Sequence, residues 1–176
     1  MSKPTKRTFI ATVEDRPGVL NRVVSLFRRR GYNIASLTVG RTHKPGVSHL
    51  TVVTEANDDV ARRIRADLYK LVNVLFVKDL CADEAIVRDL ALIKVSAGAE
   101  VRRRVLDLCE AYHARVVDVG EGTLTVELSA TTDKIDSLIE ALGPHGVLEM
   151  VTTGEIAMSG GHRASTRGGV AADAAE

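Results

Sequence analysis

The sequence predicts an α+β chain made of two similar halves, each with the order strand, helix, strand, strand, helix, strand. Three observations support this prediction. Short runs rich in β-branched residues alternate with stretches whose apolar residues recur at helical spacing. The same order of elements returns after about 80 residues. Gly, Pro and helix-capping residues stand at the expected element boundaries.

The first strand is expected at Thr8–Glu14 (TFIATVE), a short alternating run rich in β-branched residues. The segment from Asp15 to Gly18 cannot continue it, because Asp favours helix caps, Pro fixes φ for a turn and Gly allows a tight turn. A helix then follows over Val19–Arg30, and Gly31 ends it. Its apolar stripe is Leu20, Val23, Val24 and Phe27.

Gly18 is therefore expected at a helix N-terminus, where free backbone N–H groups can bind one carboxylate. From spacing alone, the commoner interpretation is a plain strand–turn–helix corner in which Pro17 and Gly18 serve only the turn. Spacing leaves both interpretations open.

The rest of the first half completes a ferredoxin-like βαββαβ domain over residues 8–82. We expect strands at Asn33–Thr42, Val47–Glu55 and Val72–Leu80, with a helix capped by Asn57 or Asp58 before the last of them. This order gives an antiparallel sheet with both helices on one face. The other face is polar enough to be wet or covered by a partner, and it carries Thr12, Ser36, Thr38 and Thr51. Residues 1–7 are expected to form a flexible arm.

The second half, residues 83–158, is expected to be another ferredoxin-like βαββαβ domain, following a polar hinge at Asp83–Ala85. Its elements are a strand at Val87–Ser96, a helix opened by Gly98 and Ala99, a hairpin of Arg115–Val119 and Leu124–Leu128, a helix capped by Thr131, Thr132 or Asp133, and a strand at Val147–Met158. No Asp-x-Pro-Gly signature opens its first helix, so no ligand corner is expected there. Residues 159–176 turn to Gly, Ala and Ser and are expected to be a disordered tail.

Composition excludes several classes of partner. The formal net charge is +1 with acids and bases interspersed, which gives no reason to expect nucleic acid or an anionic membrane. Aromatic residues make up only 3% and Trp is absent, which argues against stacking on single-stranded nucleic acid. No run has the length of a transmembrane segment or the pattern of a signal peptide, so a cytoplasmic location is expected. Cys81 and Cys109 are expected to be reduced thiols.

No residues converge on a catalytic or metal site. The motifs of phosphate loops, nucleophile elbows, zinc proteases and paired cysteines are all missing from the sequence. His49 lies in a predicted strand without a second ligand at suitable spacing. Arg28, Arg29 and Arg30 could bind phosphate, although a solvated helix end favoured by the dipole is the simpler interpretation. We therefore expect no catalytic residue, no metal and no cofactor in this chain.

The string VEDRPGVLNRVVSLFRRRGYNIASLTV resembles the ACT domain, a ligand-sensing βαββαβ module. The run from RPGVLNRV to RRGYNIASLTV is most similar to the regulatory (small) subunits of acetohydroxyacid synthase, also called acetolactate synthase. The resemblance continues through Leu68–Val74 and Arg88–Val95 and covers residues 7–158. It implies a non-catalytic regulatory subunit in branched-chain amino acid biosynthesis. Such a subunit would activate the catalytic subunit and confer feedback inhibition by valine. Thiamine diphosphate, Mg and FAD are expected on that catalytic subunit.

An amino acid would suit the corner at Gly18. Its carboxylate matches the N–H groups of Gly18, Val19 and Leu20, and its ammonium would find acceptors in the Asp15 carboxylate, the Asn33 amide and a carbonyl near Ile34. An apolar side chain would be lined by Val19, Leu20, Ile34 and Leu37. The resemblance implies that valine lies between this loop of one subunit and the Asn33–Ile34 segment of another. Bacterial relatives often have Asn at the position of Asp15; Asp15 keeps an acceptor there and adds a charge. The expected site residues are Asp15, Pro17, Gly18, Val19, Leu20, Asn33 and Ile34.

A homodimer is expected because the strand at Asn33–Thr42 is an apolar edge strand, which is a liability unless it is paired. Two other classes of protein stay open. A stand-alone amino-acid-sensing ACT protein could regulate another enzyme or transcription, although no basic helix-turn-helix is visible in the sequence. A small ferredoxin-like enzyme such as an acyl-phosphate hydrolase would need a phosphate loop, whereas the turn from Asp15 to Gly18 offers one acid and one Arg.

Overall fold

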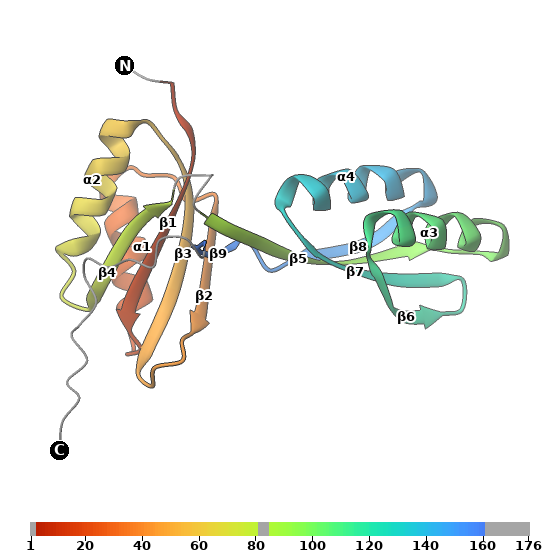
Figure 1. Cartoon of the computed structure of the whole chain (residues 1–176), viewed down its shortest axis with the longest axis horizontal. Coiled ribbons are helices and arrows are strands. Elements are labelled where there is room, and N and C mark those ends of the chain that lie inside the picture. Colours follow the sequence, from red (N-terminus) through yellow and green to blue (C-terminus); the bar gives the residue numbers. More distant parts are fainter. Residues whose placement is uncertain (1–2, 81–84, 161–176) are drawn as a thin grey trace. The chain divides into compact units, whose positions relative to one another are not determined.

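The computed structural model describes residues 3–80 and 85–160 (Figure 1). The described residues divide into two compact units. Unit 1 comprises the described residues up to Ile86 together with those from Ala157 onward, and unit 2 is Val87–Ile156. Both ends of unit 2 therefore continue into unit 1.

Unit 1 is a four-stranded antiparallel sheet with the strand order β2-β3-β1-β4. Figure 1 shows α1 and α2 on the same face of this sheet. Its elements are β1 (Thr5–Glu14), α1 (Val19–Arg30), β2 (Ser36–Arg41), β3 (Val47–Ala56), α2 (Asp58–Tyr69) and β4 (Val74–Leu80). The βαββαβ fold predicted for the first half is confirmed.

The core of unit 1 lies between the helices and the sheet. It joins alternate residues of the central strands to the buried faces of both helices, because successive strand side chains point to opposite faces. The stripe expected on α1 is wrong in part, since Leu20 and Val24 are exposed and the buried face is formed by Val19, Val23, Leu26 and Phe27. Phe9, Val23, Phe27, Val52 and Leu68 are each at most 1% exposed. Burying one such side chain contributes about 1.5–3 kcal/mol to the stability of the fold.

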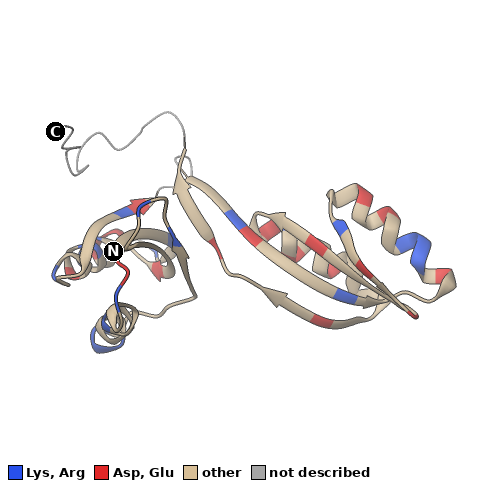
Figure 2. Ribbon diagram, turned by 90° about the horizontal axis from the view of Figure 1, so that it is seen from below, with Lys and Arg blue, Asp and Glu red and all other residues tan. Residues whose placement is uncertain are grey.

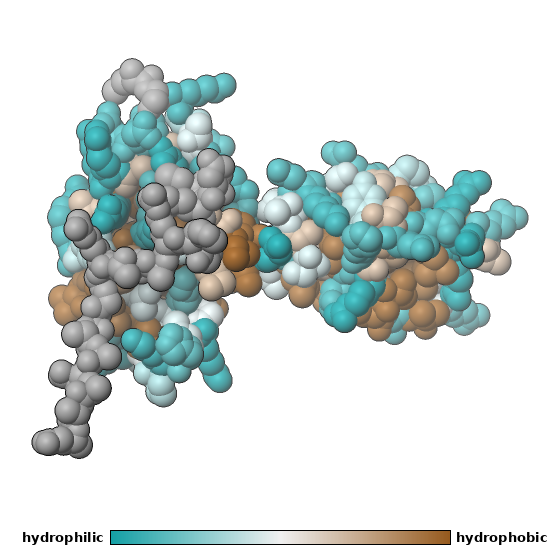
Figure 3. Space-filling view, viewed as in Figure 1, coloured by the Kyte–Doolittle hydropathy of each residue, from teal (hydrophilic) through white to brown (hydrophobic). Residues whose placement is uncertain are grey.

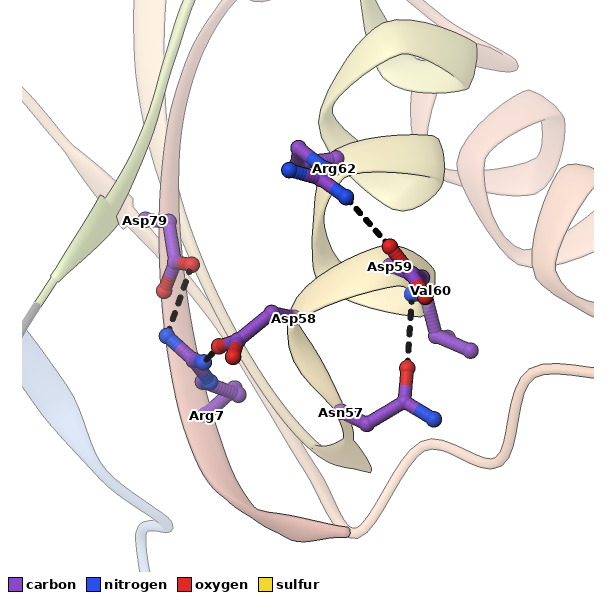
Figure 4. Close-up of polar contacts among 7 residues, drawn as sticks. All are labelled: Arg7, Asn57, Asp58, Asp59, Val60, Arg62 and Asp79. Carbon is purple, nitrogen blue, oxygen red and sulfur yellow. Dashed lines mark hydrogen bonds and ion pairs between the residues drawn. The ribbon is translucent and has the colours of Figure 1, made fainter. Parts of the chain in front are cut away.

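The expected arm over residues 1–7 is wrong from Thr5 onward, because β1 begins at Thr5 and pairs there with Ala56. Arg7 gives the physical reason, as Figure 4 shows. Its guanidinium forms an ion pair with Asp58 at the start of α2 and lies 3.3 Å (Nη1–Oδ2) from Asp79 on β4. Burial raises the pKa of Asp79, and the Arg7 charge opposes that rise. These contacts fix the N-terminal part of β1 to α2 and β4.

Asn57 caps α2, as one of the two predicted alternatives. Its Oδ1 accepts a hydrogen bond of 3.0 Å from the Val60 N–H, drawn in Figure 4. Such a cap satisfies one of the N–H groups that lack partners in the first turn of a helix.

Unit 2 repeats the architecture, with the strand order β6-β7-β5-β8 and β9 pairing with β5. Its elements are β5 (Ala85–Ser96), α3 (Ala99–Tyr112), β6 (Arg115–Gly120), β7 (Thr123–Ala130), α4 (Thr132–Leu142), the short 3-10 turn η2 (Gly143–His145) and β8 (Val147–Thr152). The strand β9 (Ile156–Ser159) begins in unit 2, and its residues from Ala157 onward belong to unit 1. The second ferredoxin-like domain is thereby confirmed as a fold. Of the expected hinge, Ala85 begins β5, whereas Asp83 and Glu84 lie outside the described residues.

The single final strand expected at Val147–Met158 is wrong, because the chain bends between β8 and β9. Gly154 has a φ of +80°, in the left-handed region that favours glycine. The Thr153 hydroxyl donates to Asp89 (2.9 Å), and the Thr132 hydroxyl donates to Glu155 (2.7 Å). These hydrogen bonds tie the bend to unit 2.

The expected boundary of the second half at residue 158 is also corrected, because Ala157 joins unit 1. There β9 lies on part of the helix-free face of the unit 1 sheet, where it contacts β3 and β4. The Ala157 N–H donates to Thr51 Oγ1 (3.3 Å), and its carbonyl lies 3.0 Å from His49 Nε2. Lys78 Nζ donates to Ser159 Oγ (3.0 Å). Thr51 is consequently 1% exposed, so this part of the polar face is covered by the chain itself. The rest of the expected tail, from residue 161, lies outside the described residues.

Charges of both signs are interspersed over the described chain (Figure 2). Among the described residues, no helix combines the length and the apolar character needed to cross a bilayer. Unit 2 exposes apolar side chains on its edge strands, including Val119 on β6. Figure 3 shows a brown, apolar region on the side of unit 2 where β6 lies in Figure 1.

Candidate functional site

The corner between β1 and α1 presents free backbone N–H groups. Gly18 is the N-terminal cap of α1 and has a φ of +85°. The Val19 N–H donates to the Arg16 carbonyl (3.3 Å), so it is already used. Over residues 3–80 and 85–160, no acceptor is found for the N–H groups of Gly18 and Leu20. Two of the three predicted donors therefore remain available to a ligand.

The side chains of the corner divide into core and surface. Val19 is 5% exposed and belongs to the core of unit 1, so the structure does not place it as a lining residue. Leu20 is 42% exposed, and Asp15 and Pro17 are exposed. A Cβ built on Gly18 would meet no heavy atom within 4 Å. The corner therefore faces open surface.

Three residues that the sequence analysis did not single out hold this corner. Asn73, just before β4, donates from Nδ2 to Glu14 Oε2 (2.8 Å) and accepts from Arg22 Nη1 (2.6 Å). The Glu14 N–H also donates to the Asn73 carbonyl (2.9 Å). These contacts join the end of β1 to the first turn of α1. Glu14 and Asn73 are 59 positions apart, so no local sequence signal reports their contact.

Asn33 and Ile34 lie in an irregular segment between α1 and β2. The strand expected at Asn33–Thr42 is too long at both ends, because β2 spans Ser36–Arg41. The Ala35 N–H donates to the Val53 carbonyl (2.8 Å), and the Thr54 hydroxyl donates to the Asn33 carbonyl. These bonds pin the main chain to β3 before regular pairing begins.

The side chains of this segment differ in their surroundings. Ile34 is half-buried and packs against the core of unit 1. The Asn33 side chain is exposed and finds no hydrogen-bond partner in the part of the chain that the structure describes. Asn33 thus offers a free amide to a ligand.

One chain does not bring the two halves of the predicted site together. Gly18 and Asn33 lie beyond opposite ends of α1, which has 12 residues. A helix of that length is about 18 Å long, because each residue adds about 1.5 Å. A single amino acid cannot span that distance, so one molecule cannot contact both segments within one chain.

The titratable groups outside this corner have structural surroundings. His49 has the Ala157 carbonyl as a partner. Burial raises the pKa of the Cys109 thiol, which makes the reactive thiolate scarcer, and Cys81 lies outside the described residues. No group of three or more His, Cys, Asp or Glu side chains is arranged to hold a metal within residues 3–80 and 85–160.

Two family models match the chain in succession. Residues 9–76 match the AHAS small subunit-like ACT domain, and residues 88–161 match the small subunit of acetolactate synthase. The chain is 40% identical to the acetolactate synthase small subunit of Mycolicibacterium smegmatis, over 89% of this chain and 92% of that protein. It is 43% identical to the corresponding protein of Mycobacterium leprae, over the same shares of the two chains.

A solved structure supports the same assignment. The fold is similar to the crystal structure of the acetolactate synthase small subunit from Thermotoga maritima, with a TM-score of 0.85 and 30% identity. That match covers 90% of this chain and 99% of the other. On the strength of these sequence and structure matches, the chain belongs to the family of acetolactate synthase small subunits, and its first unit is an ACT domain.

Proposed function

We propose that this chain associates with the acetolactate synthase catalytic subunit, activates it, and makes the complex sensitive to valine bound where two ACT domains meet. Its membership of the small-subunit family supports the association. The catalytic chemistry, with thiamine diphosphate, Mg and FAD, belongs to the partner subunit in a cytoplasmic complex. This chain contributes the effector site.

The observation that carries the proposal is the separation of the two polar segments along α1. The free N–H groups of Gly18 and Leu20 stand at one end of the helix, and the free amide of Asn33 stands at the other. In a twofold dimer whose axis is perpendicular to α1, two copies of α1 placed side by side run antiparallel. The Gly18 end of one copy then faces the Asn33 end of the other, so the dimer builds two equivalent sites.

The edge of the ACT sheet supports such a dimer. The strand β2 is at the end of the order β2-β3-β1-β4, so one of its sides is available for pairing. Apolar side chains are exposed on β2 and on α1, namely Val39 (47%), Leu20 (42%) and Val24 (38%). A second copy would cover these side chains and continue the sheet.

Valine suits the groups that this dimer would bring together. Its carboxylate would accept from the N–H groups of Gly18 and Leu20, and its ammonium would donate to Asp15 and Asn33. Charge-assisted hydrogen bonds contribute about 1.5–3 kcal/mol each, and burying a small aliphatic side chain contributes about 1.5–3 kcal/mol. After the cost of association, the dissociation constant falls roughly in the micromolar to millimolar range. That range matches feedback by a metabolite.

Regulation follows because valine bridges two protomers. A ligand shifts a conformational equilibrium only when it binds one arrangement better than the other. Valine contacts both chains, so its affinity depends on their relative arrangement. A coupling of about 1–3 kcal/mol would change the activity of the attached catalytic subunit several-fold or more.

The variant Asn33→Ala tests this proposal. We expect it to raise the half-inhibitory valine concentration of the reconstituted synthase by about 10-fold or more, since one hydrogen bond to a charged group is lost. Its melting temperature should stay unchanged, because the Asn33 side chain is exposed. Activation of the catalytic subunit without valine should also stay unchanged.

Asn57→Ala is the matched control, since it removes the cap of α2 and should lower the free energy of unfolding by about 1 kcal/mol without changing the valine response. An Asn33→Ala complex inhibited as strongly as wild type would contradict the assignment. Valine binding without any activation of the catalytic subunit would instead favour a stand-alone amino-acid sensor.

A further inference from the structure

Asp67 is a buried carboxylate whose oxygens are fully used. It is 5% exposed and lies near the end of α2. Its Oδ1 accepts from Lys70 Nζ (2.7 Å) and Arg30 Nη2 (3.2 Å). Its Oδ2 accepts from the Tyr32 hydroxyl (3.2 Å) and lies 3.1 Å from Arg30 Nε. The Lys70 hydrogen bond outweighs burial and holds the pKa of Asp67 below its ordinary value, so the group stays ionised.

The partners of Asp67 lie directly before the proposed effector segment. Arg30 is the last residue of α1, and Tyr32 precedes Asn33. Between them Gly31 turns the chain, with a φ of +69°. The Tyr32 ring packs edge-on against Phe27, with ring centroids 5.7 Å apart. Tyr32 is therefore fixed by an aromatic contact on its ring and by Asp67 at its hydroxyl.

Asn33 is thus held from two sides. On one side the Thr54 hydroxyl and the Val53 carbonyl fix the main chain of Asn33 and Ala35 against β3. On the other side Asp67 fixes the two residues that flank Gly31. Without the Asp67 carboxylate, Arg30 and Lys70 would be two cations that lack their common counter-ion. The Tyr32 hydroxyl would also lose its acceptor.

We propose that Asp67 is the positioning residue of the effector site: by holding Arg30 and Tyr32 it fixes the turn that presents Asn33 to a ligand bound by the other protomer. This inference rests on the proposed function. Asp67 does not touch the ligand in this account. Asp67 preserves the affinity for the ligand because the Asn33 amide is already ordered before binding. No binding free energy is then lost in ordering it.

The test compares Asp67→Asn with Asp59→Asn in the reconstituted synthase. Both residues lie on α2, and both form an ion pair with a base three positions on, Asp67 with Lys70 and Asp59 with Arg62. Both changes remove one negative charge, but only Asp67 reaches Arg30 and Tyr32. We expect Asp67→Asn to raise the half-inhibitory valine concentration at least about fivefold and Asp59→Asn less than about twofold. Activation without valine should be unchanged in both.

Tyr32→Phe separates positioning from general stability. It removes one hydroxyl and leaves the ring contact with Phe27. We expect it to raise the half-inhibitory concentration as well, and we expect the double variant Asp67→Asn/Tyr32→Phe to do no worse than Asp67→Asn alone, because both changes break one network. A residue that only stabilised the fold would instead lower the melting temperature without raising the half-inhibitory valine concentration. Should Asp67→Asn fail to fold, Tyr32→Phe alone carries the test.

The outcomes distinguish this inference from the proposed function. Suppose that valine inhibits the wild-type synthase and that Asn33→Ala is resistant. If Asp67→Asn is then as sensitive to valine as wild type, only the role of Asp67 is overturned. Where Asp67→Asn does not fold, the same result for Tyr32→Phe has the same meaning. If wild type is not inhibited by valine at all, the proposed function fails, and this inference fails with it.

Discussion

Gly18→Asp is expected to abolish inhibition by valine while leaving activation of the catalytic subunit intact. Gly18 has a φ of +85°, which Asp tolerates better than most side chains, so α1 should still form. A Cβ at this position points into open space, where the proposed carboxylate of valine would lie. Two like charges about 4 Å apart repel by about 4 kcal/mol near a protein surface, more than a 100-fold loss of affinity. Acetolactate formation measured against valine concentration checks this expectation.

Gly122→Asp is the matched control. Gly122 has a φ of +73°, and a Cβ there also meets no heavy atom within 4 Å. It lies in the turn between β6 and β7 of unit 2, where no effector site is expected. Its valine response should equal that of wild type, and Gly18→Asn should lose less affinity than Gly18→Asp because it adds no charge. A Gly18→Asp complex that valine inhibits normally would show that the carboxylate does not bind at this corner.

Ala157→Asp is expected to have the largest effect on stability. Ala157 is 5% exposed, and its N–H and carbonyl both contact side chains of β3. An unpaired carboxylate there should lower the free energy of unfolding of unit 1 by about 3 kcal/mol or more, either by burial of the charge or by loss of β9 from the face of the unit 1 sheet. The melting temperature of unit 1 should fall by about 10 °C or more.

Met158→Asp is the control for this prediction, since Met158 is the next residue and is 59% exposed. Its free energy of unfolding should stay within about 0.5 kcal/mol of wild type. Equal unfolding midpoints for the two variants in urea would mean that β9 does not contribute to the stability of the ACT sheet.

Elements defined by local signals could be predicted from the sequence. The bounds of α1 follow from its apolar stripe and from Gly31, and the start of α2 follows from the Asn57 cap. Elements defined by distant contacts could not. The start of β1 depends on Arg7, whose partners lie 51 and 72 positions away. The separate strand β9 depends on Ala157 reaching Thr51, 106 positions away.

The candidate site shows the same division. Gly18 and Asn33 belong to short strings whose residue types suggest their chemistry. The sequence predicts that Val19 contributes to the ligand site as Gly18 and Leu20 do. In the structure the Val19 N–H donates to the Arg16 carbonyl and its side chain packs in the core. Asn73 and Asp67 support the two segments through tertiary contacts, which no spacing rule reports.

The most direct measurement of the central claim mixes two variants whose valine binding is impaired. Consider a mixed dimer of one Gly18→Asp chain and one Asn33→Ala chain. If each of its two sites is shared between the protomers, one site contains both changes and the other site contains neither. Random exchange of subunits should therefore restore about one quarter of the wild-type valine-binding capacity. The capacity is measured by calorimetry at a valine concentration that saturates wild type and leaves each variant alone largely unoccupied. If each site lay within a single chain, every site would keep one change and the mixture would bind valine no better than the variants alone; that result would contradict the account.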